Sequence, residues 1–136
     1  MTVVESWAFV DGHGHGDGCG DGALPVAPDD AIAVLRRRIA HGTFESWLAG
    51  SSGRLLAVVT NAERAMVMLL NGAGDPGEHA TDPGAEGWSD GFVLANGQSD
   101  EYPDEDTVPL EEALRIVRHV LATGGPPADA AWTVDR

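Results

Sequence analysis

The chain contains no lysine, and its eight basic residues are all arginines. None of them lies between Arg64 and Arg115, whereas residues 65–114 hold twelve of the 22 carboxylates. That stretch therefore carries a formal charge of −12, out of −14 for the whole protein. Charge of one sign repels polyanions and attracts basic surfaces. The pattern argues against nucleic acid as a partner and favours a basic protein.

Cysteine and long apolar runs are also scarce. Cys19 is the single cysteine, which excludes an intrachain disulfide and makes a reducing compartment the simpler expectation. No apolar run approaches the roughly 18 residues that a membrane span needs. The first residues lack the basic and apolar regions of a signal peptide. We therefore expect no membrane association and a cytoplasmic location.

Glycine and proline, in contrast, are abundant, with 18 and 8 residues. They gather at 11–28 and 71–87, which we predict to be long loops. A length of 136 residues is typical of one domain with its own core. We therefore expect a single domain over residues 1–136.

Apolar periodicity predicts two helices. The first is expected from Asp29 or Asp30 to about Ala40, and Asp is a residue type that caps helices. The second is expected from Pro109, where the missing N–H costs little, to a firm stop at Gly124.

Alternating and β-branched segments predict a series of strands, and Asn96-Gly97 is a strong signal for a hairpin turn. The expected strands cover residues 3–10, 44–49, 55–60, 65–70, 88–95, 98–102 and 130–134. Consecutive strands with two helices indicate an α+β fold. We expect a mainly antiparallel sheet of about five to seven strands, with both helices packed on one face.

The glycine-rich segment contains the residues with the strongest chemical potential. His13, His15 and Cys19 lie among aspartates and are residue types that bind zinc. A segment made mostly of glycine cannot hold four ligands in place before the metal binds, and the same pattern is typical of a mobile polar loop. We expect no metal, no cofactor and no enzyme. A small metal-binding or hydrolytic protein that uses this loop remains the alternative.

A second candidate site combines aromatic and acidic side chains around the predicted 88–102 hairpin. Rings supply contact area and carboxylates speed association with a basic partner. A solvated acidic face with Trp88 and Tyr102 in the core would be the simpler explanation. The candidate partner-binding residues are Glu86, Trp88, Asp90, Asp100, Glu101, Tyr102, Asp104, Glu105 and Asp106.

The C-terminal third carries a recognisable pattern. Val108-Pro109-Leu110 opens the second helix, which ends in Leu121-Ala122-Thr123-Gly124-Gly125, Pro126-Pro127 and a strand with Ala131-Trp132. Gly87-Trp88-Ser89 and Glu101-Tyr102-Pro103 precede it. Over residues 54–134 the chain resembles the family-one immunity proteins of bacterial polymorphic toxin systems.

The resemblance implies a small cytosolic antidote that forms a heterodimer with a secreted toxin domain and blocks its active site. Similar proteins often accompany nucleic-acid deaminase toxins, so the resemblance implies a zinc-dependent cytidine deaminase as the favoured partner, with nuclease toxins as the alternative. The resemblance carries over no catalytic residue. A regulatory subunit for some other basic protein remains a further alternative.

Overall fold

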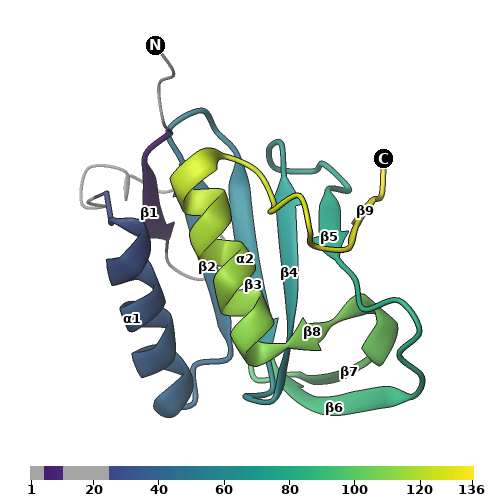
Figure 1. The fold of residues 1–136 in the computed structure, drawn as a ribbon. Helices are drawn as coiled ribbons and strands as arrows, with labels where there is room; N and C mark the ends of the chain where they lie inside the picture. The colour runs from purple at the N-terminus through teal and green to yellow at the C-terminus, as the bar shows by residue number, and fades with distance from the viewer. Residues whose placement is uncertain (1–4, 11–24) are drawn as a thin grey trace.

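A computed structural model describes residues 5–10 and 25–136 of the chain (Figure 1). Its elements are β1 (Trp7–Val10), α1 (Pro28–Ala40), β2 (Glu45–Gly50), β3 (Leu55–Thr60), β4 (Arg64–Leu70), β5 (Glu78–Ala80), β6 (Trp88–Val93), β7 (Ser99–Pro103), the 3₁₀ turn η2 (Asp104–Asp106), β8 (Val108–Pro109), α2 (Leu110–Thr123) and β9 (Trp132–Val134).

Seven of these strands form one antiparallel sheet. Its order is β1-β2-β3-β4-β5-β9, and the short β8 also pairs with β4. Strands β6 and β7 form a separate two-stranded antiparallel sheet. Both helices lie on the same face of the large sheet (Figure 1), where α2 contacts α1 and β4. The predicted α+β class, with two helices on one face, is confirmed.

The core lies between this sheet and the two helices. Alternate residues of each strand point to opposite faces, and the inward set includes Leu48, Leu56 and Val67. They meet the apolar stripes of α1 and α2, which include Leu35 and Val117. The central β3 is buried along nearly its whole length, as its continuous apolar sequence predicts.

The start and the end of α2 follow from single residues. Pro109, which has no N–H to leave unpaired, stands immediately before the helix. Gly124 ends it with φ of 91°, a left-handed conformation that costs glycine little.

An ion pair on the surface joins the two helices. The exposed Arg36 of α1 pairs with Glu111 of α2 at 2.8 Å.

Several boundaries differ from the sequence-based expectations. The predicted 71–87 loop contains β5, which the sequence does not signal because its Glu-His-Ala lacks β-branched residues; pairing with β4 and β9 makes it a strand. The predicted 11–28 loop lies outside the described residues up to residue 24, and α1 already begins at Pro28. Neither described helix has the length and apolarity that crossing a membrane requires.

We expect the substitution Leu35→Ala to lower the free energy of unfolding by about 2–5 kcal/mol, because it leaves a cavity where α1 meets the sheet. Urea denaturation measures the change. Arg37→Ala, on the exposed side of the same helix, is the control and should stay within roughly 0.5 kcal/mol. Equal effects from the two variants would contradict the placement of α1.

Candidate protein-binding surface

Residues 88–103, which comprise β6, β7 and their turn, form a two-stranded hairpin that we call the ribbon. Trp88 lies opposite Pro103, and Ser89 opposite Tyr102. The register then shifts, so that Phe92 lies opposite Asp100. Gly91 lies within this irregularity. Its φ of 84° is a left-handed backbone conformation, which the shift in register requires and which glycine adopts readily.

The register gives the ribbon an inner and an outer face. Phe92 is fully buried on the inner face, and its ring meets the edge of Tyr102 at a centroid distance of 5.1 Å. The outer face carries Trp88, whose exposed fraction is 65%, together with Asp90 and Glu101, which are also exposed. Phe92 therefore fills the position under the ribbon that the simpler explanation assigned to Trp88. Tyr102 is half-buried against Phe92, whereas that explanation placed it in the core.

Two contacts hold the ribbon against the main sheet. The side chain of Asn61, in the turn between β3 and β4, donates a hydrogen bond to the backbone carbonyl of Asp90 at 2.8 Å. At the hairpin turn, the backbone N–H of Ala95 donates to the carboxylate of Glu45 on β2, also at 2.8 Å. The outer face is thus presented by a supported hairpin.

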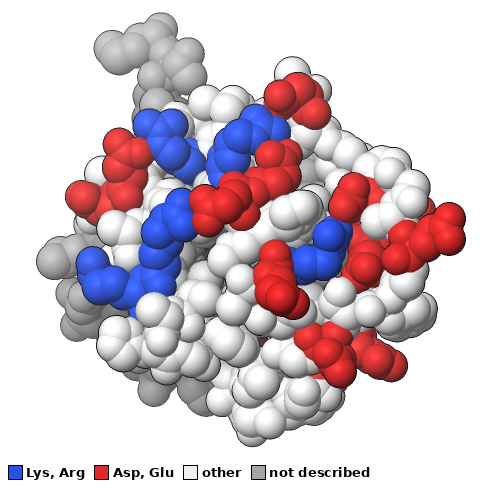
Figure 2. Space-filling model, turned by 60° about the horizontal axis from the view of Figure 1, so that its bottom comes forward, with Lys and Arg blue, Asp and Glu red and all other residues white. Residues whose placement is uncertain are grey.

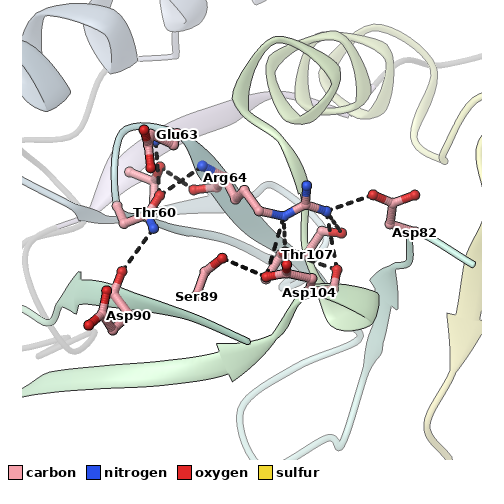
Figure 3. Close-up of polar contacts among 9 residues, drawn as sticks. Thr60, Glu63, Arg64, Asp82, Ser89, Asp90, Asp104 and Thr107 are labelled. Atoms are coloured by element: carbon pink, nitrogen blue, oxygen red, sulfur yellow. Dashed lines mark hydrogen bonds and ion pairs between the residues drawn. The ribbon is translucent and has the colours of Figure 1, made fainter. Parts of the chain in front are cut away.

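Arg64 fixes the other end of the ribbon (Figure 3). Its side chain is only 20% exposed, and the guanidinium group donates to Thr107 Oγ1 and to Asp82 Oδ2, each at 2.7 Å. It also donates to the backbone carbonyls of Asp104 and Thr107, at 3.2 and 3.0 Å. A single cation therefore joins the start of β4 to two segments of the most acidic part of the chain, at Asp82 and at residues 104–107.

Of the seven predicted acidic residues, three bind a polar or basic side chain and four do not make an ion pair with any described residue. Asp104 accepts a hydrogen bond from Ser89 at 2.5 Å and lies 3.9 Å from Arg64 Nε. Asp100 accepts a hydrogen bond from the hydroxyl of Tyr102 at 3.1 Å. The pKa of Tyr102 is raised mainly by burial and, to a smaller extent, by this hydrogen bond. Asp106 contacts His79 at 3.1 Å. Asp100 and Asp104 thus bind side chains of the ribbon, and Asp106 binds β5 through His79.

The other four predicted carboxylates are exposed. None of them makes an ion pair with any described residue; they are Glu86, Asp90, Glu101 and Glu105. Figure 2 shows acidic side chains gathered over the right-hand part of that view with little basic surface among them, whereas basic and acidic groups alternate on the left. Exposed Trp88 lies among unneutralised charge of one sign.

All nine predicted residues thus lie on the ribbon or directly beside it, although on different faces. Glu86 precedes β6, and residues 104–106 form η2 immediately after β7. The prediction omitted Val93, an apolar residue of the outer face with an exposed fraction of 37%. Its position follows from the strand register, and the sequence alone does not reveal the register shift that sets it.

His79 on β5 connects η2 with the C-terminal segment. Its two ring nitrogens lie 2.7 Å from Asp135 and 3.1 Å from Asp106. Burial lowers the pKa of His79, but the hydrogen bonds and the charges of the two aspartates raise it by more. The pKa of His79 therefore lies above its ordinary value of 6.5, because protonation lets each ring nitrogen donate to one carboxylate.

The alternative site, His13, His15 and Cys19, lies outside the described residues. Among the residues that are described, no group of three or more His, Cys, Asp or Glu side chains is arranged to hold a metal ion. A cavity of about 450 Å³ lies between the start of α1 and the end of α2. Its carboxylate, Glu5, already accepts hydrogen bonds from Ser52 and Arg54. The ribbon remains the candidate site with the most support.

Comparison of the chain with protein-family models, with curated proteins and with solved structures finds no match. The proposal below therefore rests on the chain's own residues and on the resemblance over residues 54–134.

We expect Arg64→Lys to destabilise the protein by about 2 kcal/mol, because an ammonium group cannot make the four directed hydrogen bonds of the guanidinium and leaves buried Thr107 without its donor. Urea denaturation and amide hydrogen exchange at residues 104–107 measure the effect. Arg118→Lys is the matched control, since Arg118 is exposed and contacts one carboxylate. An unchanged midpoint and unchanged exchange in Arg64→Lys would contradict the assignment.

His79 should make stability depend on pH. Since its folded pKa lies above the ordinary value, its contribution is fully present below about pH 6.5 and is lost as the pH rises through the folded pKa. We expect His79→Gln to cost roughly 1–2 kcal/mol near pH 6 and clearly less near pH 8.5. Urea denaturation of both proteins across this range tests the trend. A difference that grows with pH would have the wrong sign.

Proposed function

We propose that this protein is an immunity protein, which binds a cognate toxin domain and neutralises it by covering a basic active-site cleft. The partner that we favour is a nucleic-acid deaminase, specifically a cytidine deaminase, and the complex is a cytoplasmic heterodimer. The observation that carries the proposal is the outer face of the ribbon, where a two-thirds exposed tryptophan lies among carboxylates without cationic partners. The resemblance over residues 54–134 supports the same function.

The exposed ring of Trp88 supports a binding role because it does not contribute to the packing of the ribbon. The ribbon packs on the sheet through Phe92, so the fold does not require an aromatic residue at position 88. When a partner covers a large exposed tryptophan, the apolar surface of the ring is removed from water, and this burial stabilises the complex. Such residues dominate the energetics of many interfaces.

The unneutralised charge supports a basic partner. Enzymes that act on nucleic acid present cationic clefts to phosphate groups, and a carboxylate surface competes for the same cations. Attraction of this kind raises association rates towards about 10⁸ M⁻¹s⁻¹ at low salt. The same charge repels nucleic acid itself, so the protein opposes the toxin without binding the substrate of the toxin.

The decisive experiment is rescue of growth. The chain is expressed together with the catalytic domain of the toxin that is encoded beside it, and survival is scored against an empty vector. Survival with a co-purifying complex is expected. Death of cells that contain the intact chain in soluble form would refute the proposal for that toxin.

We expect Trp88→Ala to weaken toxin binding by about 2 kcal/mol, or roughly thirtyfold, mainly through faster dissociation. Surface plasmon resonance with the toxin domain measures the rates. Val134→Ala removes a similarly exposed apolar side chain from β9 and should bind as the wild type does. An unaffected Trp88→Ala would exclude the ribbon as the binding surface.

Neutralising the outer carboxylates should change the association rate, whereas Trp88→Ala should mainly change the dissociation rate. The triple variant Glu86→Gln, Asp90→Asn, Glu101→Gln should associate more slowly and depend less on salt, because steering is lost while the ring remains. Asp30→Asn on α1, an exposed acid far along the chain from the ribbon, is the control. Unchanged salt dependence in the triple variant would contradict electrostatic capture.

A further inference from the structure

The face of the large sheet that the helices do not cover is also apolar. Since α1 and α2 pack on the side that includes Leu48, Leu56 and Val67, the intervening residues point to the other side. We call five of them the open face: Trp47 of β2, Leu55 of β3, and Met66, Met68 and Leu70 of β4. All five are half-buried, and no described helix lies over them (Figure 1).

The pairing register makes the open face continuous. Trp47 of β2, Ala57 of β3 and Met68 of β4 form one row across three strands, and the row continues through His79 of β5 to Thr133 of β9. Leu55 lies beside Leu70 in the next row. Ala57 and Val59 on this face are buried, and the five open-face side chains around them remain partly exposed. Partly exposed apolar side chains that lie close together offer surface that a partner can cover. Methionines are also typical of surfaces that adapt their shape to a partner.

Acidic groups border the open face along the ribbon. The carboxylate of Glu45, in the row next to Trp47, binds the ribbon's turn through Ala95. At the far strand, Asp106 of η2 reaches His79. The apolar residues therefore adjoin the same acidic ribbon that presents Trp88. An apolar centre with a polar rim is the usual anatomy of an interface between proteins.

The size of a stable interface gives a second reason to connect the two surfaces. Such an interface takes about 800 Å² and 20–30 residues from each partner. Only roughly half of residues 88–103 point outward, so the ribbon alone is too small. The open face is the partly exposed apolar surface that adjoins it.

Charge decides between the possible occupants. A second copy of this chain would bring a net charge of −14 against an equal charge, beside carboxylates that have no cations to neutralise them. A cationic protein experiences the opposite force. On this basis, we infer that the open face is the apolar centre of the interface with the basic toxin domain, with the ribbon as its acidic rim. The inference rests on the proposed function.

The test uses Met68→Glu with the toxin domain as the probe. If binding involves the ribbon alone, an added carboxylate beside it strengthens attraction to a basic partner. If Met68 is covered by an apolar part of the toxin, the new charge is desolvated without a partner, and affinity falls at least about tenfold. The two possibilities therefore predict changes of opposite sign. Ala33→Glu, on the exposed side of α1, adds the same charge elsewhere and is the control.

A second measurement needs no substitution. Hydroxyl-radical footprinting of the wild-type chain, free and in complex, reports the oxidation of Met66 and Met68 by mass spectrometry. We expect both rates to fall at least about threefold in the complex, because the interface centre excludes water. This readout decides the matter even if Met68→Glu fails to fold.

The outcomes separate the inference from the proposal that it rests on. Tight toxin binding with unprotected methionines, or stronger binding by Met68→Glu, overturns the inference and leaves the ribbon as the whole site. Failure of the wild-type chain to bind the toxin overturns both. A dimer in sedimentation that Met68→Glu abolishes assigns the open face to a second copy and also overturns the inference.

Discussion

The guanidinium group of Arg64 is the interaction on which the acidic half of the molecule depends. It joins the first residue of β4 to Asp82 and to the backbone of residues 104–107, which are distant from one another in the sequence. Carboxylates brought together without a cation would repel one another. Because this arginine is shielded beneath them, it opposes that repulsion from within and leaves the outward carboxylates unneutralised. The folded state can therefore be stable even though several carboxylates of this region remain exposed and without a cationic partner.

The sequence determined the architecture to a large extent. Continuous apolar character identified β3 as central, and the stripe of α2 with its terminal Gly124 gave the helix and its end. The three-residue β5 was missed because its pairing partners, rather than its own residue types, make it a strand. Long-range pairing of this kind has no local sequence signal.

The candidate site was predictable in its location and less so in its orientation. Composition alone placed acids and aromatics around the 88–102 hairpin. The register shift between Ser89 and Phe92 decides which residues point outward, and a shift of one position reverses the two faces of a strand. Arg64 was also missed as the organising cation, since its partners become neighbours only after folding. The immunity function and the toxin partner remain proposals.

The division of the ribbon into two faces has a consequence for how such a protein can diverge. Phe92 and Tyr102 hold the hairpin in place, while Trp88, Asp90 and Glu101 contribute little to the packing beneath it. Substitutions at the outward positions therefore carry a small risk of misfolding. A lineage can therefore change these outward residues repeatedly while its scaffold stays intact.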